Sequence, residues 1–148
     1  MAVPINRDFP DRPFTAALAV CRRGERVLLA QRAKGPGPAI GKWGFPGGMQ
    51  ELGETILAAA ARELLEETGI SSEPLRVVDA FDVIGKEDDE RIRAHFTLVC
   101  VVLDWRGGEG QAIEDATAVG WYSPDEAVQK LELFPDTLRL MKAALALP

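Results

Sequence analysis

The chain has 148 residues, of which 47% are hydrophobic and 27% are charged, and its formal net charge at pH 7 is -6. A chain of this length is expected to form a single domain, residues 1–148, whose core needs no disulfide or metal for stability. Because nucleic acids are bound mainly through clusters of Lys and Arg, the acidic balance argues against a nucleic-acid polymer as partner.

The amino-terminal segment and the cysteines bear on the compartment. Residues 1–14 contain no apolar segment of signal-peptide length, and no later run approaches the roughly 18 residues that cross a bilayer. We therefore expect a cytoplasmic protein that does not enter a membrane. Cys21 and Cys100 lie in apolar, strand-like runs, so in a reducing compartment they are expected to be small core residues.

A hairpin and a loop are predicted first along the chain. Residues 14–22 and 26–32 are apolar runs separated by a short turn that contains glycine, which is typical of two paired strands. Residues 33–48 are rich in Gly and Pro, and they predict a surface loop with at most a short strand around Trp43 and Phe45. Loops of this kind often carry functional residues.

The remaining elements are a helix, further strands and two terminal helices. Thr55 is a suitable N-cap for the helix, and Gly69 stands where a left-handed residue ends one. Three strand-like runs follow, and the only histidine, His95, lies in the second of them with an expected structural role. Ser123 and Glu126 form a capping box at the start of another helix, and a last helix is predicted over about residues 136–146. The strand-like runs are residues 75–84, 92–105 and 116–122.

This order of elements predicts the fold class. Strands, a helix, more strands and terminal helices do not follow the regular alternation of βαβ units. We expect an α/β protein in which helices pack on both sides of a mixed β-sheet.

The helix predicted after Thr55 is strongly amphipathic. At 100° per residue, Arg62, Glu63, Glu66 and Glu67 share one arc of about 140°. The opposite side is expected to pack on the sheet because its residues are small or apolar. Those residues are Leu57, Ala58, Ala60, Ala61, Leu64, Leu65 and Thr68.

The cluster of carboxylates on one face of this helix has two interpretations. An acidic helix face is usually solvated, with pairs such as Arg62 and Glu66 contributing a few tenths of a kcal/mol. Here, however, a glycine-rich segment precedes the helix, so that backbone can approach a ligand closely, and it delivers Glu54 to the helix start. Hard cations such as Mg²⁺ take oxygen ligands from carboxylates, carbonyls and phosphates, whereas the scattered Cys and His residues do not suit zinc. This pattern favours metal-assisted hydrolysis of a phosphate-containing molecule.

Residues 48–70, GMQELGETILAAAARELLEETGI, resemble the complete Nudix box, Gx5Ex7REUxEExGU. The segments GKWGFPGG before the box and GWYSPDEA near the end are also similar to the wider family. The resemblance implies a Nudix-type α/β/α sandwich around a mixed β-sheet. It also implies Mg²⁺-dependent hydrolysis, with Mn²⁺ as an alternative ion, of a nucleoside diphosphate linked to another moiety.

The resemblance further implies roles for individual residues. Glu63 and Glu67 correspond to the main metal ligands, Glu66 to a further ligand, and the Gly47 carbonyl to a backbone ligand. Arg62 corresponds to the residue that orients the glutamates through salt bridges. Glu54 has a supporting role, either by pairing with Arg62 or by reaching a metal-bound water.

The general base is not decided by the sequence. Many family members use an acid on a loop before the final strand, and here Glu114 and Asp115 stand in that region. Glu109 is a more remote candidate, and Glu63 itself could serve as the base. Each loop acid could equally be a solvated surface residue.

Two substrate classes remain open. Residues 94–127 resemble the corresponding stretch of small bacterial ADP-ribose pyrophosphatases, which favours ADP-ribose. A proline expected about fifteen residues beyond the box in one ADP-ribose signature is absent, because Gly85 and Lys86 stand there. The alternative is a (d)NTP pyrophosphohydrolase that removes damaged nucleotides.

Several residues outside the box are candidates for binding the substrate. Arg32 and Lys42 could contact phosphates, and Phe45, Trp43 or Phe81 could stack on a base. Each could also be a surface cation or a core aromatic residue, with no role in binding. A third function, a non-catalytic nucleotide-binding module, has little need for Glu63, Glu66 and Glu67 together. Homodimerisation is expected only because symmetric pairs are common.

Overall fold

The structure, a computed structural model, describes residues 8–32, 40–113 and 116–148. The hairpin, the box helix and the later strands lie where the sequence predicts them, and strands β5 and β6 are longer than expected. The strands are β1 (Phe14–Arg23), β2 (Arg26–Arg32), β3 (Trp43–Gly44), β4 (Gly47–Met49), β5 (Ser71–Lys86), β6 (Ile92–Gly107) and β7 (Ala116–Tyr122). The helices are α1 (Ile56–Thr68), α2 (Pro124–Lys130) and α3 (Thr137–Ala146).

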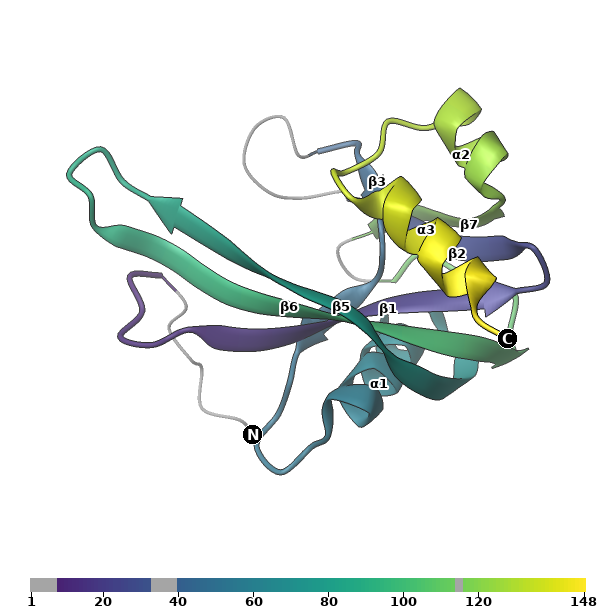
Figure 1. Cartoon of the computed structure of the whole chain (residues 1–148), viewed down its shortest axis with the longest axis horizontal. Helices are drawn as coiled ribbons and strands as arrows, with labels where there is room; N and C mark the ends of the chain where they lie inside the picture. Colours follow the sequence, from purple (N-terminus) through teal and green to yellow (C-terminus); the bar gives the residue numbers. More distant parts are fainter. Residues whose placement is uncertain (1–7, 33–39, 114–115) are drawn as a thin grey trace.

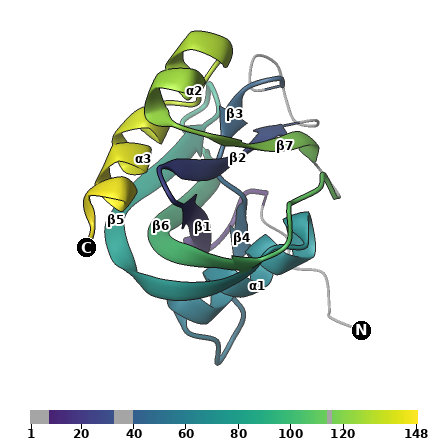
Figure 2. The ribbon, with the colours of Figure 1, turned by 90° about the vertical axis from the view of Figure 1, so that its right-hand side faces the viewer.

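The strands of the described segments form one mixed sheet. Its order is β3-β2-β1-β6-β5, with β4 paired to β1 and β7 paired to β2. Strand β1 runs parallel to β6, whereas the other pairs are antiparallel. Figure 2 shows the sheet almost end on, with its strong curvature around the space between β2, β7 and β4. The predicted mixed sheet is therefore confirmed.

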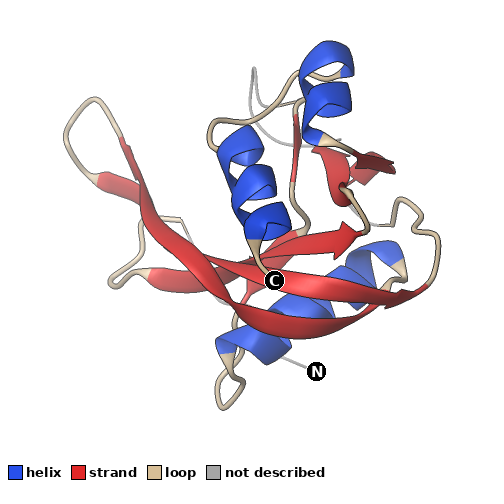
Figure 3. Ribbon diagram, turned by 45° about the vertical axis from the view of Figure 1, so that its right-hand side comes forward, coloured by secondary structure: helices blue, strands red, loops and turns tan. Residues whose placement is uncertain are grey.

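Helices cover both faces of this sheet, as Figures 1 and 3 show, with α1 on one side and α3 on the other. Alternating strand residues supply a separate core to each face, because successive side chains of a strand point in opposite directions. In β1, Ala19 and Cys21 pack toward α1, and Val20 packs toward α3. The sequence of helices and strands thus forms the expected α/β/α sandwich.

The cysteines are core residues, as the sequence predicts. Cys21 and Cys100 are free thiols with no exposed surface. Burial raises the pKa of each thiol to about 12, and nearby carboxylates, Asp104 for Cys21 and Asp79 for Cys100, add to the increase.

Helix α1 has the predicted ends. Thr55 accepts a hydrogen bond from the backbone N–H of Ala58, and Gly69 closes the helix with φ 76° while donating its N–H to the Leu65 carbonyl. The packing face differs from the helical-wheel prediction at three residues. Leu65 is 51% exposed and Ala58 is also exposed, whereas Ala59, on the glutamate side, is fully buried. The reason is that α1 contacts β4 as well as β1, β5 and β6, so the glutamate side is itself covered.

The terminal helices follow local sequence signals. The Ser123 side chain accepts a hydrogen bond from the Glu126 backbone N–H, and the Glu126 carboxylate accepts one from the Ser123 N–H, which confirms the capping box. The Ser123 N–H and the Arg26 guanidinium lower the pKa of Glu126 to about 2. Helix α3 lacks a side-chain cap: Asp136, its N-cap residue, has φ 68° and its carboxylate instead accepts hydrogen bonds from Arg139.

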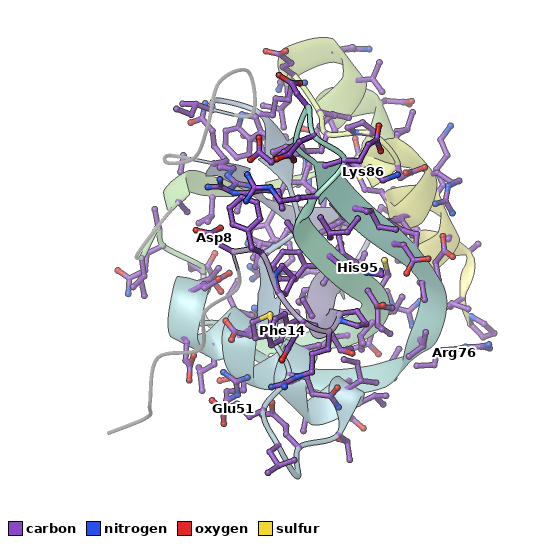
Figure 4. All side chains as sticks on the ribbon, turned by 90° about the vertical axis from the view of Figure 1, so that its left-hand side faces the viewer. Asp8, Phe14, Glu51, Arg76, Lys86 and His95 are labelled. Atoms are coloured by element: carbon purple, nitrogen blue, oxygen red, sulfur yellow. The ribbon has the colours of Figure 1, made fainter. Side chains whose placement is uncertain are left out.

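Strands β5 and β6 form a hairpin whose turn projects beyond the helices (Figure 1). Opposite residues pair along most of its length, from Ser71 with Gly107 to Lys86 with Ile92. Figure 4 marks Lys86 near this turn and His95 on β6, where His95 pairs with Ile84 in the ladder. Across the described segments, every helix is too short or too polar to span a bilayer.

Candidate active site

Arg62 lies at the centre of the carboxylates in α1. Its Nε and Nη2 atoms donate to the two oxygens of Glu54, at 2.6 and 2.9 Å. Its Nη1 donates to Glu63 at 2.9 Å and to Glu66 at 3.2 Å, and Nη2 also reaches the Met49 carbonyl at 2.9 Å. One guanidinium thus binds the Glu54 side chain of the loop, a backbone carbonyl of β4 and side chains from two turns of the helix. Arg62 therefore bonds three of the glutamates of the cluster, and its role in orienting them for catalysis stays a prediction.

The charge balance of this cluster follows from the hydrogen bonds. The Arg62 guanidinium lowers the pKa of Glu54, first by its hydrogen bonds, and the Glu51 N–H adds to the effect. In return, the Glu54 carboxylate is the main reason that the pKa of Arg62 is raised above its ordinary value. Glu51 lies in the loop before α1 (Figure 4), with its carboxylate 3.7 Å from Arg62. The two central groups therefore remain ionised at neutral pH.

The two glycines of β4 lie against the other carboxylates. The N–H of Gly47 donates to Oε2 of Glu67 at 3.1 Å. A Cβ atom on Gly48 would stand 2.3 Å from the carboxyl carbon of Glu63, so only glycine leaves room for that carboxylate. A Cβ atom on Gly47 would lie 2.2 Å from the Ala17 carbonyl oxygen of the neighbouring strand. Adjacent glycines of one strand thus meet carboxylates from successive turns of α1.

The oxygen-rich composition fits a hard divalent cation. Carboxylates of Glu63, Glu66 and Glu67 and a backbone carbonyl of β4 are the ligand types that Mg²⁺ prefers. The side chain of Glu63 is 14% exposed and that of Glu66 is 51% exposed, so the cluster runs from a covered side to solvent. Within residues 8–32, 40–113 and 116–148, no three acidic, His or Cys side chains are already arranged as a metal cage. Arg62 instead holds oxygens of Glu63 and Glu66.

A cleft of about 770 Å³ adjoins this cluster, which is a usual size for a small-molecule site. Gly47 and Glu67 contribute to its wall, so it is continuous with the carboxylates. The other lining residues come from β1, β2, β3, β5, β6 and β7, from the segments before β4, β7 and α3, and from α3 itself. Its aromatic and polar lining residues are Gln31, Arg32, Phe45, Phe81, Asp82, Phe134, Asp136 and Thr137.

The binding residues predicted outside the box divide into two groups. Arg32, Phe45 and Phe81 line the cleft, whereas Lys42 and Trp43 do not. The Trp43 ring instead packs edge-on against Tyr122, with ring centroids 5.6 Å apart. These observations give Trp43 the core position that was its alternative interpretation.

The candidate general bases lie in different parts of the chain. Glu114 and Asp115 fall outside the described residues. Glu109 forms an ion pair with Arg23 at 3.1 Å and is not among the residues that line the cleft. Glu63 is in the cluster, with an oxygen bonded to Arg62.

The comparison with protein families agrees with this arrangement. The model of the NUDIX domain matches residues 11–144. The chain belongs to the Nudix hydrolase family. It is therefore an enzyme of a family that acts on small nucleotide substrates and generally uses divalent metal ions.

Relatives of this Nudix hydrolase carry different substrate names. A Mycobacterium tuberculosis protein, provisionally named 8-oxo-dGTP diphosphatase 2, is 40% identical over 104 residues, 70% of this chain and 69% of that protein. A Methanocaldococcus jannaschii protein named ADP-ribose pyrophosphatase is 31% identical over 104 residues, 70% of this chain and 58% of its own length. The crystal structure of a MutT NUDIX hydrolase from Burkholderia pseudomallei has a TM-score of 0.69 at 28% identity and covers 90% of this chain and 98% of that one.

Sequence reasoning missed several residues that line the cleft of this Nudix hydrolase. Phe134 and Asp136 stand between the terminal helices, and Asp82 lies in β5. The Phe-Pro-Asp segment had a detectable signal, because an acid and an aromatic residue next to proline mark a loop that can carry function. Asp82 had no such signal, because an acid in an alternating strand is usually solvated.

Proposed function

We propose that this Nudix hydrolase cleaves the pyrophosphate linkage of a purine nucleoside triphosphate in the presence of Mg²⁺, releasing the nucleoside monophosphate and pyrophosphate. The observation that carries the proposal is the contact of Glu63 and Glu67 with the glycines of β4, of which the pair Gly47 and Glu67 lies at the wall of the cleft. The substrate class is favoured by the 40% identity to the protein provisionally named 8-oxo-dGTP diphosphatase 2.

Glu63 and Glu67, with Glu66 and the Gly47 carbonyl, are the proposed ligands of the cation. When bound, Mg²⁺ neutralises charge on the phosphates and lowers the pKa of a water molecule. Arg62 restricts the rotamers of Glu63 and Glu66 through its hydrogen bonds. Glu54 keeps Arg62 in place with both of its carboxylate oxygens.

The lining of the cleft also suits the purine ring of the nucleotide. Phe81 and Phe134 offer apolar surface for an aromatic ring. Asp82 and Asp136 are acceptors for the amino and ring N–H groups of a purine. Arg32 supplies a positive charge in the same lining, where it could contact a phosphate.

ADP-ribose is the second candidate substrate. The resemblance of residues 94–127 and the relative from Methanocaldococcus jannaschii favour it. That relative is less similar than the first and the match covers less of its length. The absence of the signature proline, with Gly85 and Lys86 in its place, also weakens this candidate.

A product assay separates these functions. The protein is incubated with Mg²⁺ and, separately, with dGTP, 8-oxo-dGTP, dATP, ADP-ribose and a dinucleotide, and the products are separated by ion-exchange chromatography. We expect pyrophosphate and a nucleoside monophosphate from a purine triphosphate. Release of AMP and ribose 5-phosphate as the dominant activity would instead identify the second candidate.

Three further measurements test the catalytic assignment itself. Removal of divalent ions with EDTA should abolish turnover, and added Mg²⁺ should restore it. Nucleotide binding by calorimetry without any hydrolysis across the panel would refute the proposal in favour of a binding module. The three acids Glu63, Glu114 and Asp115 are compared as single Gln or Asn variants, and the general base is the one whose loss removes the acidic limb of the pH profile, where the base would become protonated.

A further inference from the structure

A loop from Gly108 to Ile113 covers the carboxyl-terminal end of α1. The backbone N–H of Gln111 donates to the Thr68 carbonyl at 3.0 Å, and that of Ile113 donates to the Glu67 carbonyl at 3.1 Å. The last carbonyls of a helix have no partner within the helix. In this protein the loop supplies hydrogen-bond donors to two of these carbonyls. One of the two carbonyls belongs to Glu67, whose carboxylate contacts β4.

The loop lies in close contact with the end of the helix. Gly108 and Gly110 have φ values of 89° and 92°. A Cβ atom on Gly108 would stand 2.9 Å from the Gly69 carbonyl oxygen, and one on Gly110 would stand 3.1 Å from Cδ1 of Ile70. Larger residues at either position would therefore push the loop away from α1.

Two tryptophans hold the other side of this loop. The indole N–H of Trp105, from β6, donates to the Gly108 carbonyl at 2.6 Å. The indole N–H of Trp121, from β7, donates to the Glu109 carbonyl at 3.0 Å. Consecutive carbonyls of the loop are thus fixed by indoles from separate strands.

Arg23, at the end of β1, joins the two indoles. Its guanidinium carbon lies 3.8 Å from the centre of the Trp105 ring and 5.7 Å from that of Trp121. Its Nη1 also pairs with the Glu109 carboxylate at 3.1 Å. We call the set Arg23, Trp105 and Trp121 the tryptophan clamp.

We propose that the tryptophan clamp positions Glu67 for catalysis through the loop Gly108–Ile113, so that Arg23, Trp105 and Trp121 are positioning residues of the active site. The chain of contacts is continuous: the indoles hold the loop carbonyls, the loop N–H of Ile113 holds the Glu67 carbonyl, and the Glu67 carboxylate accepts from Gly47. This inference rests on the proposed function, in which Glu67 is a ligand of the metal.

Substitution of Arg23 in the clamp is expected to alter the geometry of the active site more than the free energy of unfolding. Arg23 and Glu109 have side chains that are 35% and 82% exposed, and ion pairs of this kind contribute little to stability. Small displacements of a catalytic group, in contrast, can reduce rates strongly. The clamp, whose half-buried indoles pack against the core on the α1 side, can therefore matter for turnover although it lies outside the cleft lining.

The test uses Trp121→Phe and Arg23→Ala, with Arg106→Ala as matched control. Phenylalanine keeps an aromatic ring but removes the indole N–H. Arg106, near the same end of β6, pairs with Glu73 and donates to the backbone carbonyl of Trp105, so its removal leaves both indole hydrogen bonds of the clamp in place. For each protein, Mn²⁺ binding is measured by electron paramagnetic resonance without substrate. Steady-state kinetics at saturating Mg²⁺ give kcat and KM, and amide hydrogen exchange reports on Ile113.

We expect Trp121→Phe and Arg23→Ala to lower kcat by about tenfold and weaken Mn²⁺ binding by about fivefold, with KM within about twofold of wild type. Exchange at the Ile113 amide should accelerate in the same variants and stay unchanged in Arg106→Ala. Wild-type values of kcat and Mn²⁺ affinity in both variants would overturn the proposal, as would a rise in KM alone. If the wild-type protein neither binds Mn²⁺ nor turns over any nucleotide, it is the proposed function that fails.

Discussion

Replacement of Gly48 by alanine should separate activity from stability. The added Cβ would lie 2.3 Å from the carboxyl carbon of Glu63, and 2.5 Å from each of its oxygens. Ordinary van der Waals contact between these carbons needs about 3.5 Å, so the carboxylate must move by about 1 Å. The atoms displaced are the far end of a flexible side chain, so the fold can accept the change. A catalytic group misplaced by about 1 Å can cost about 100-fold in rate.

The assay for Gly48→Ala combines kcat at saturating Mg²⁺ with the melting temperature. We expect kcat to fall by about 100-fold, while the free energy of unfolding changes by less than about 1 kcal/mol. Gly85→Ala is the control, because its Cβ would meet Ala94 only at ordinary contact distance, 3.9 Å. Unchanged kcat in Gly48→Ala would refute the view that Glu63 acts from its position against this glycine.

Gly47→Ala, in contrast, should lower stability, because its Cβ would lie 2.2 Å from the Ala17 backbone oxygen, which cannot move without shifting β1. Thermal unfolding should show that the free energy of unfolding falls by about 2 kcal/mol or more. Glu67→Gln should keep the fold by circular dichroism and lose most turnover, and full activity would contradict its assignment as a metal ligand. Because Arg62 lowers the pKa of Glu54, the stability from this pair is present above the unfolded-state value of about 4.5 and lost as pH falls below it. Melting curves of wild type and Glu54→Gln should therefore differ at pH 7 and converge in strongly acidic solution.

Much of the local structure could be predicted from the sequence because its signals are local. Thr55, Gly69 and the Ser123 capping box fix helix ends through bonds between near neighbours. The Nudix box likewise predicts which carboxylates share one face of α1. The parallel pairing of β1 with β6 joins Phe14 to Phe96, and no short-range pattern specifies such a distant partner.

The parts of the site that depend on tertiary packing could not be predicted. The sequence shows that Gly47 and Gly48 are adjacent, but not that one contacts Glu67 and the other Glu63. Leu65 is exposed although it is apolar, because α1 is covered on its glutamate side by β4 and so turns another part of its surface to solvent. The use of Trp105 and Trp121 to hold one loop depends on two strands that are far apart in the chain.

The state of the cysteines has a practical consequence for studying this enzyme. The sequence contains two cysteines, and both are inaccessible thiols whose pKa of about 12 leaves almost no thiolate at neutral pH. A maleimide reagent should therefore leave the native protein unmodified. A cysteine introduced in place of Lys86, near the projecting hairpin turn, would become the single labelling position for a fluorescent or spin probe without any need to remove the natural thiols.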